Sequence, residues 1–265
     1  MAKRYSISLI ISTYNRPDAL ELILLSVLKQ TVLPHEVIIA DDGSRQETQQ
    51  LIEQYKASFP LPLVHVWHED AGFRLSVIKN KAVAKATSDY VIFIDGDLVI
   101  HRNFIEDYSK NIKPNSILVA SRVFLSEGYT KELLSDKNAS VIINNKTVEK
   151  NKIASYRIPW LHHLIKGSQT YKGARGGLMG VFKSDFVKVN GFDESFTGWG
   201  REDSDLYVRL LNTGVKRFNI KFAAITYHLW HKEISRDKLS LNDRLLEESI
   251  KQKRTWCPNG IDKYL

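Results

Sequence analysis

The sequence predicts an α/β fold built on a doubly wound, mostly parallel sheet. Short apolar runs alternate with amphipathic stretches of helical period through the first half of the chain. The run Tyr90–Ile94 is apolar throughout, as a central strand of a parallel sheet should be. Polar motifs directly follow three of these runs, and doubly wound sheets bind ligands beyond the carboxyl ends of their strands.

The first half is expected to form a β-α-β-α-β-α-β series. Its strands are expected at 7–11, 36–40, 63–67 and 90–94, and its helices at 17–30, 47–57 and 76–86. Ser44 is placed to cap the second of these helices. The segments Tyr14-Asn15-Arg16, Asp41-Asp42 and Asp95-Gly96-Asp97 each follow a strand end, so we expect them to converge on one cleft.

The second half is less regular. The stretch from Ser126 to Lys172 has no clear period and is expected to wrap the cleft as loops and short elements. Strands are expected over 176–182 and 220–229, and helices over 184–189, 203–211 and 239–254. The sequence contains no internal repeat and no linker rich in Gly, Ser or Pro, so residues 1–265 are expected to form one domain.

The composition is that of a soluble globular protein, with 43% hydrophobic and 26% charged residues. No stretch approaches the roughly 20 apolar residues of a membrane span. The chain starts without the apolar region of a secretory signal, so a cytoplasmic location is expected. Cys257 is the only cysteine, which excludes an internal disulfide and a cysteine-based metal site.

The net charge is +8, from 38 Lys and Arg against 30 Asp and Glu. A solvated, slightly basic surface accounts for such a balance. A functional interpretation would be an anionic partner, namely a nucleotide diphosphate, a phosphorylated glycan or a membrane face. Nucleic acid is not an expected partner, because the densest basic cluster, Lys251–Arg254, directly follows acidic residues and no binding motif accompanies it.

Two acidic motifs, Asp95-Gly96-Asp97 and the segment Gly198–Asp203, suggest a shared task. Each alone is weak evidence, because Asp and Gly are simply good loop formers. Asp95 and Asp97 supply hard oxygen ligands for Mg²⁺ or Mn²⁺, and Gly96 lets the backbone approach phosphates closely. A metal held there would neutralise charge on a leaving nucleotide diphosphate. Together the motifs outline a metal-dependent transferase acting on a sugar nucleotide.

The expected donor site uses the ends of the first two strands. Asp42 is placed to accept the N3–H of uracil, although an Asp-Gly turn explains the position equally well. The guanidinium groups of Arg16 and Arg74 suit phosphate oxygens, although each alone could be a surface arginine. Ser12 and Tyr14 belong to the same strand-end segment as Arg16 and complete the expected donor site.

His228 and His231 lie three residues apart at the end of a strand-like run. No H-E-x-x-H motif accompanies them, so a zinc protease is not indicated. Imidazole can complete a carboxylate ligand set for Mn²⁺, and His231 is the preferred further ligand beside Asp95 and Asp97, although the two histidines are not separable from sequence. His101, His162 and His163 are expected to be structural.

Asp203 is the candidate general base. Inversion at an anomeric carbon requires a carboxylate that deprotonates the acceptor hydroxyl opposite the leaving group. Glu202 would orient the acceptor, and Trp199, flanked by Gly198 and Gly200, offers a flat surface for a sugar ring on a loop free to move. The alternative is a polar helix N-terminus in which Glu202 and Asp203 only complement the helix dipole.

At these residues the chain resembles family 2 glycosyltransferases of the GT-A fold, a Rossmann-like α/β fold. Ser12-Thr13-Tyr14-Asn15-Arg16-Pro17, Asp41-Asp42-Gly43-Ser44 and Asp95-Gly96-Asp97 are similar to their nucleotide-binding half. The segment from Gly176-Gly177 through Gly191-Phe192-Asp193 and the second acidic motif to Leu206 is similar to a region shared by β-1,4-galactosyltransferases and chondroitin-polymerase-type enzymes.

The resemblance implies an inverting, Mn²⁺-assisted transfer of a hexose or N-acetylhexosamine from a UDP-sugar to a glycan hydroxyl. It places the uracil carboxylate at Asp42, metal or phosphate contact at Asp95 and Asp97, the base at Asp203 and a metal ligand at His231. The galactosyltransferases have methionine where this chain has His228, so the metal sphere could hold one histidine or two.

The resemblance also implies a biological setting, which is bacterial surface polysaccharide or lipooligosaccharide synthesis. Residues 1–125 would form the nucleotide-sugar-binding half, and residues 126–265 the acceptor-binding half with a carboxyl-terminal helix. A lipid-linked or a phosphorylated acceptor stays open, as does peripheral contact with the inner face of the cytoplasmic membrane.

Two other classes share some of these features. A non-catalytic glycan- or nucleotide-binding module on this fold should tolerate loss of the base, yet Glu202 and Asp203 are both present. A sugar-nucleotide nucleotidyltransferase also uses a doubly wound sheet and Mg²⁺. It usually has a glycine-rich loop after the first strand, where this chain has Ser12–Pro17. The donor sugar, the acceptor and the linkage depend on the shape of the cleft and stay open.

Overall fold

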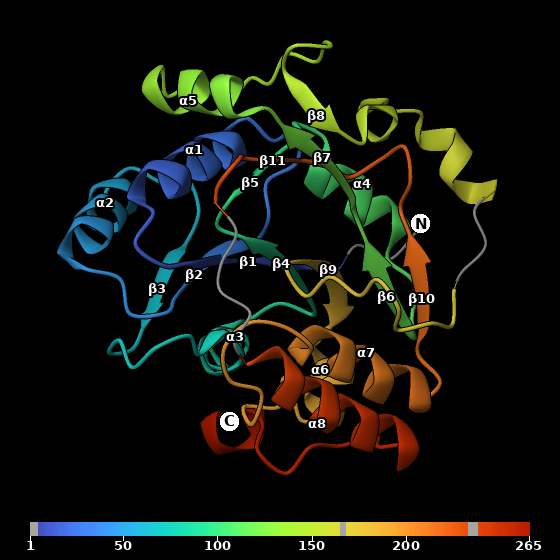
Figure 1. Cartoon of the computed structure of the whole chain (residues 1–265). Helices are drawn as coiled ribbons and strands as arrows, with labels where there is room; N and C mark the ends of the chain where they lie inside the picture. The colour runs from blue at the N-terminus through green and yellow to red at the C-terminus, as the bar shows by residue number, and fades with distance from the viewer. Residues whose placement is uncertain (1–4, 165–167, 233–237) are drawn as a thin grey trace.

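The structure is a computed structural model that describes residues 5–164, 168–232 and 238–265, with only the backbone at 162–164. A central sheet carries helices on both faces, and a smaller sheet lies beside it (Figure 1). Among the described residues, no helix combines the length and the apolar character needed to cross a membrane.

Seven strands form the central sheet in the order β10-β6-β9-β4-β1-β2-β3. β4, β1, β2 and β3 run parallel, whereas β9 is inserted antiparallel to both β4 and β6. The doubly wound, mostly parallel sheet predicted from the sequence is therefore confirmed. The strands are β1 (Ile7–Thr13), β2 (Glu36–Asp41), β3 (Leu63–Trp67), β4 (Tyr90–Asp95), β6 (Ser116–Val119), β9 (Leu178–Phe182) and β10 (Lys216–Asn219).

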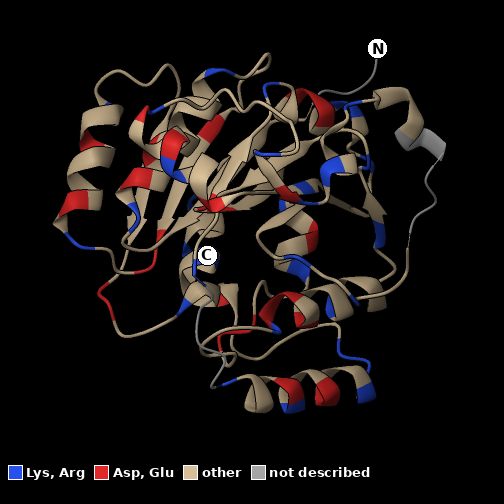
Figure 2. Ribbon diagram, turned by 45° about the horizontal axis from the view of Figure 1, so that its top comes forward, with Lys and Arg blue, Asp and Glu red and all other residues tan. Residues whose placement is uncertain are grey.

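The helices form a layer on each face of this sheet (Figure 1). One layer holds α1 (Pro17–Leu28), α2 (Gln46–Lys56) and α4 (Phe104–Asn111). The other holds α3 (Leu75–Lys85), α6 (Lys183–Lys188), α7 (Glu202–Asn212) and the short 3₁₀ helix η3 (Ile261–Tyr264). The last α-helix, α8 (Leu239–Lys251), packs on α7 and carries both acidic and basic segments (Figure 2).

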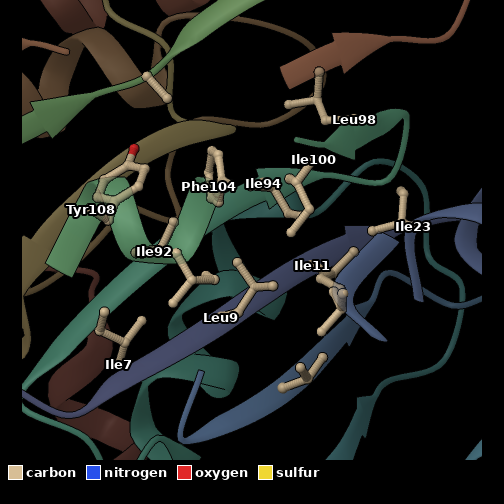
Figure 3. Close-up of a cluster of buried hydrophobic side chains, with 14 of the residues drawn as sticks. Ile7, Leu9, Ile11, Ile23, Ile92, Ile94, Leu98, Ile100, Phe104 and Tyr108 are labelled. Carbon is tan, nitrogen blue, oxygen red and sulfur yellow. The ribbon is translucent and has the colours of Figure 1, made fainter. Parts of the chain in front are cut away.

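The two cores follow from the alternation of side chains along the strands. Successive residues of a strand point to opposite faces, so β1 sends Leu9 and Ile11 into one core and Ile10 into the other. Figure 3 shows the first of these cores, where Leu9 and Ile11 meet Ile92, Ile94 and residues of the covering helices. Because the central strands are buried on both faces, their sequences are almost continuously apolar.

A second sheet has the order β5-β11-β7-β8. It is formed by β5 (Leu98–Ile100), β11 (Ile225–His228), β7 (Ser121–Leu125) and β8 (Val148–Lys150). β11 runs antiparallel to β5 with His228 opposite Leu98, so the end of β11 lies next to the residue that precedes β5. This pairing brings the second half of the chain to the end of β4.

One local feature differs from the sequence-based expectations. The expected cap of α2 is wrong, because the N-cap residue is Arg45 and Ser44 Oγ instead accepts a hydrogen bond from the Asn15 amide at 2.8 Å.

The described part of the stretch 126–172 consists of loops and short elements, as expected. Besides β8, these are the helix α5 (Glu127–Ser135), whose amino end is capped by Ser126, and the short 3₁₀ helices η1 (Lys152–Ser155) and η2 (Pro159–Leu164).

Candidate active site

Three polar segments meet at the carboxyl ends of β1, β2 and β4. The parallel register places Ser12 opposite both Ala40 and Asp95. Ser12 Oγ donates a hydrogen bond to Asp95 Oδ1 at 3.3 Å, and the amide of Asp42 donates to the carbonyl of Thr13 at 3.0 Å. The structure therefore brings the expected donor-side segments together at one edge of the sheet.

The carboxylate of Asp42 is buried and oriented from two sides. Its Oδ1 lies 2.6 Å from Nε2 of His68, and its Oδ2 accepts the amide of Arg74 at 2.9 Å. Burial raises the pKa of Asp42, although these two contacts oppose the rise. A carboxylate oxygen accepts more than one hydrogen bond, so each oxygen keeps capacity for a ligand donor.

The remaining expected donor residues lie around this carboxylate. Tyr14 is half exposed and donates through its hydroxyl to Asp70 at 2.9 Å. Arg16 precedes α1 and pairs with Asp18 at 2.9 Å on the surface. The guanidinium of Arg74 donates to the carbonyl of Glu69, so the contact of Arg74 with Asp42 is made by its backbone.

Glycine is required at position 96 by packing against β1. A Cβ atom there would lie 2.4 Å from the carbonyl oxygen of Ser12, which is closer than real Cβ atoms approach. The glycine therefore holds the turn against β1 whether or not a phosphate binds. The two aspartates that flank it have different partners.

The carboxylate of Asp95 lies beside two basic side chains. Its Oδ1 lies 3.4 Å from Nζ of Lys79, and its Oδ2 lies 3.9 Å from Nη2 of Arg122. Its amide donates to the carbonyl of Gly177 at 3.1 Å. A Cβ atom at Gly177 would lie 1.8 Å from Cγ of Asp95, so only glycine leaves room for this carboxylate.

Asp97 forms a potential metal site with two histidines from β11 and the loop that follows it. Its Oδ2 lies 3.2 Å from Nε2 of His228 and 3.0 Å from Nε2 of His231. One possible ligand atom from each of the three residues lies within 4.8 Å of the other two. Asp95 is not part of this group, so the two aspartates of the motif are not equivalent.

The chemistry of this group fits a divalent cation. Burial alone would raise the pKa of Asp97, but the hydrogen bonds from His228 and His231 outweigh it and hold the pKa well below its usual range. The buried Oδ1 of Asp97 has no hydrogen-bond partner among the described residues. A carboxylate with one unsatisfied oxygen beside two imidazoles is a donor set that Mn²⁺ accepts.

Glu202 and Asp203 form a half-buried acidic pair at the amino end of α7. Asp203 accepts the amide of Gly176 at 3.1 Å on Oδ2 and the amide of Ser204 at 2.6 Å on Oδ1. Burial raises the pKa of Asp203 despite these bonds, and burial together with the charge of Asp203 raises the pKa of Glu202 to about 8. A pKa of about 8 keeps Glu202 protonated at neutral pH.

Lys79 of α3 is a site residue that the sequence reasoning missed. Its side chain is 1% exposed, yet it lies within hydrogen-bond reach of Asp95 and its charge lowers the pKa of both Glu202 and Asp203. The signal was present in the sequence, because Lys79 occupies the same buried face of α3 as Ile78 and Ala82. A lysine on such a face is rarely buried without a partner.

The loop before α7 has a left-handed backbone at three positions. Gly198, Gly200 and Arg201 have φ angles of +70°, +100° and +79°. The carbonyl of Gly200 accepts Nδ2 of Asn242 at 2.8 Å, which ties the loop to α8. Trp199 is 38% exposed, which leaves part of its ring surface accessible.

Three histidines, His101, His162 and His163, were expected to be structural. His101 lies in the loop after β5, where its Nδ1 accepts the amide of Asn103 at 3.2 Å and burial lowers its pKa. This contact fits the structural role expected for it. The side chains of His162 and His163 lie outside the described residues.

The chain matches two family models. The model of glycosyl transferase family 2 matches residues 8–166, and the model of the N-terminal domain of galactosyltransferase matches residues 163–232. The first match covers more than half of the chain. The second includes Asp203, His228 and His231.

Curated relatives of the chain include two bacterial synthases and a bacterial glucosyltransferase. The chain is 27% identical to chondroitin synthase of Escherichia coli, over 84% of the chain and 34% of that protein. It is 26% identical to hyaluronan synthase of Pasteurella multocida (78% and 23%) and 25% identical to validoxylamine A glucosyltransferase of Streptomyces hygroscopicus subsp. limoneus (79% and 48%). The chain therefore spans less than half the length of each of these relatives.

Two solved structures show the likeness of fold. S. aureus TarS 1-349 in complex with UDP superposes with a TM-score of 0.61 at 17% identity, covering 94% of this chain and 68% of that one. The mannosyltransferase PcManGT from Pyrobaculum calidifontis, in complex with GDP-Man and Mn²⁺, gives 0.60 at 16% identity, covering 96% and 64%. At these identities the likeness shows the fold alone.

Proposed function

The chain belongs to glycosyl transferase family 2 and has the GT-A fold, and on that premise we propose that it is an inverting enzyme that transfers a hexose or N-acetylhexosamine from a UDP-sugar to a glycan hydroxyl. One observation carries the proposal: two consecutive glycines separate a donor-side carboxylate from an acceptor-side one. Gly177 lies against Asp95, and a Cβ atom at Gly176 would lie 2.8 Å from Cβ of Asp203. The leaving phosphate and the attacking hydroxyl would therefore meet at this backbone.

The nucleotide would bind over the ends of β1 and β2. The orientation that His68 and Arg74 give Asp42 supports its role as acceptor for the uracil N3–H. Cytosine has no such donor, so this contact would select uridine nucleotides. Tyr14 and Arg16 lie on the segment that follows β1, beside the same edge of the sheet.

The diphosphate would lie between Asp95 and the Asp97–His228–His231 group. These three residues would hold Mn²⁺, and the ion would neutralise the charge that develops on the leaving UDP. Asp95 lies outside the group that could bind the ion directly. Its Oδ1 lies 3.4 Å from Nζ of Lys79, so its role would be to hold this cation near the phosphates.

Asp203 would remove the proton of the acceptor hydroxyl. Its raised pKa makes it a stronger base than an ordinary aspartate. The neighbouring Glu202 has a pKa of about 8 and is protonated at neutral pH, so it can donate a hydrogen bond to an acceptor oxygen. Trp199 would supply a stacking surface for the acceptor ring.

The relatives support a setting in bacterial glycan synthesis, since chondroitin synthase, hyaluronan synthase and poly-beta-1,6-N-acetyl-D-glucosamine synthase are among them. We therefore propose a growing surface glycan as the acceptor. The division into a donor half at 1–125 and an acceptor half at 126–265 stays part of the proposal, with one modification. His228 and His231 come from the second half but would act on the donor.

The proposal is tested by a screen of UDP-sugars with Mn²⁺ against a panel of glycan acceptors. The anomeric configuration of the product would be determined by NMR spectroscopy. An α-linked donor should give a β-linked product, and the product should be absent with GDP-sugars. A product with retained configuration would exclude Asp203 as the base that activates the acceptor.

A further inference from the structure

Two arginines beside the catalytic carboxylates are not used by the proposed chemistry. Arg122 lies on β7 with its side chain 17% exposed, and its buried Nε has no partner among the described residues. Arg175 immediately precedes Gly176 and Gly177, which contact Asp203 and Asp95. Within the part of the chain that the structure describes, the guanidinium of Arg175 makes no hydrogen bond and no ion pair.

A third arginine holds the segment that precedes Arg175. Arg217 of β10 donates through its guanidinium to the carbonyls of Thr170, Lys172 and Gly173, at 3.1, 2.9 and 3.0 Å. It therefore fixes the segment that leads to Arg175. The terminal nitrogens of Arg217 are engaged by these carbonyls, whereas those of Arg175 are available to a ligand.

Arg175 holds its charge at an energetic cost. Burial lowers the pKa of Arg175, and the positive charges of Arg122 and Arg217 lower it further. A partly buried guanidinium that lacks a carboxylate and faces two other cations is destabilising unless an anion joins it. The planar fork of a guanidinium binds a carboxylate or phosphate through two parallel hydrogen bonds.

The location of Arg175 indicates which substrate would carry the anion. Its backbone continues into the Gly176 amide that donates to Asp203, so the side chain starts on the acceptor side of the site. Arg122 lies on the other side, 3.9 Å from Asp95, where it also packs 5.9 Å from the Phe124 ring. Together they flank the place where the acceptor would meet the base.

We propose that Arg175 and Arg122 form a binding site for a carboxylate or phosphate group on the acceptor sugar. The enzyme would then prefer acceptors that end in a uronic acid or carry a phosphate near the attacking hydroxyl. This inference rests on the proposed function, because it assumes that Asp203 marks the acceptor side.

The test uses matched acceptor pairs that differ only in charge. One set contains oligosaccharides ending in a uronic acid and their carboxyl-reduced counterparts; the other contains phosphate-bearing oligosaccharides and their dephosphorylated counterparts. Binding to the enzyme saturated with UDP and Mn²⁺ is measured by calorimetry. We expect the anionic member to bind at least about tenfold tighter in one set, as a charge-assisted bidentate contact should provide. The set that shows the preference identifies the anion.

The Arg175→Gln variant should abolish that preference without changing UDP affinity, and Arg175→Lys should restore only part of it, because an ammonium group lacks the fork. The matched control is Arg244→Gln, an exposed arginine on α8, which should keep the preference. Because the Arg175 side chain makes no bonds to the described residues and its charge is unpaired, Arg175→Gln should unfold at or above the wild-type temperature.

Three outcomes would overturn the inference. Equal binding of the charged and the uncharged acceptor in both sets, or no binding of any acceptor, would show that the arginines do not bind an anionic group on the acceptor. A loss of UDP affinity in Arg175→Gln with the preference intact would assign Arg175 to the diphosphate. The proposed inverting transfer would survive each of these results, since product configuration tests it separately.

Discussion

Nε2 of His231 lies 3.0 Å from Oδ2 of Asp97, although the two residues belong to opposite halves of the chain. The antiparallel pairing of β5 and β11 produces this contact, and the amide of Leu229 secures it by donating to the carbonyl of Asp97 at 2.9 Å. The candidate metal group is therefore assembled by tertiary structure. A donor half limited to residues 1–125 would lack two of its three ligands.

The first prediction concerns this metal group. Asp97→Ala should abolish Mn²⁺-dependent UDP binding, because Asp97 supplies the only carboxylate of the group. His231→Ala should raise the Mn²⁺ concentration needed for half-maximal UDP binding. His228→Ala should do so to a similar extent, because both rings lie equally near Asp97. Calorimetry of UDP binding at several Mn²⁺ concentrations measures these effects.

Glu53→Ala is the control for these variants, since Glu53 is an exposed carboxylate on α2 and does not belong to the group. It should leave the Mn²⁺ requirement unchanged. If Asp97→Ala retained Mn²⁺-dependent UDP binding of wild-type affinity, the metal would have to be held elsewhere.

The second prediction separates chemistry from donor binding. Asp203→Asn keeps the size of the side chain but removes its basic oxygen. A general base contributes about 10²–10⁴-fold, so the transfer rate should fall by that factor. UDP affinity should stay within about twofold of wild type, because Asp203 contacts the Gly176 and Ser204 amides rather than the donor-side residues. Steady-state kinetics and UDP titration give the two numbers, and near-normal transfer would remove Asp203 from the mechanism.

The third prediction is a bell-shaped pH profile. Asp203 must be ionised to accept a proton, so activity should rise with pH through its raised pKa, above the usual range of aspartate. Glu202 must be protonated to donate a hydrogen bond, so activity should fall as the pH rises through about 8. Glu202→Gln stays a donor at every pH and should lose the alkaline limb. An alkaline limb that persists in this variant would belong to another group.

The same pair gives a fourth prediction, for stability. Because the pKa of Glu202 is higher in the folded state than in the unfolded state, the folded protein binds the extra proton and loses stability as the pH rises from about 4.5 to about 8. Glu202→Gln lacks this loss. Its unfolding temperature relative to wild type should therefore be several degrees higher at pH 9 than at pH 5. Thermal unfolding in the presence of a chelator measures it, and an equal difference at both pH values would argue against a protonated Glu202.

Much of the fold could be predicted from the sequence because the central strands are buried on both faces. Burial makes β1, β2 and β4 almost continuously apolar, and the polar residues that follow them must then collect at one edge of the sheet. Asp42, Asp95 and Ser12 were located by this reasoning alone. Ser44 was not, because Asn15 competes for the hydroxyl that would have capped α2.

The rest of the site depends on contacts that a linear pattern does not carry. The β5–β11 pairing involves strands of three and four residues, too short to show a period, yet it decides that both His228 and His231 reach Asp97. Arg122 and Arg175 look like ordinary surface arginines until β7 and the glycine segment are placed beside Asp95. The steric need for Gly177 likewise exists only once that carboxylate is in position.

The last prediction concerns Lys79, the buried cation between the two acidic sites. Lys79→Met preserves the apolar stem of the side chain but removes the charge that lowers the pKa of Glu202 and Asp203. Both pKa values should rise, so the acid limb of the activity profile should move to higher pH. Lys79→Arg keeps a positive charge, so the pH of half-maximal activity on the acid side should be closer to that of wild type. Lys85→Met, on the exposed face of the same helix, should not change this pH.

A purely structural role for Lys79 predicts a different pattern. The variant Lys79→Met would then lose unfolding temperature and activity together, and the pH at half-maximal activity would not change. The position of Lys79 favours the electrostatic role, because its Nζ lies 3.4 Å from Asp95 while the side chain is 1% exposed. At such burial a cation interacts with nearby carboxylates much more strongly than at the surface. A pH profile of folded Lys79→Met that superposes on the wild-type profile would exclude that role.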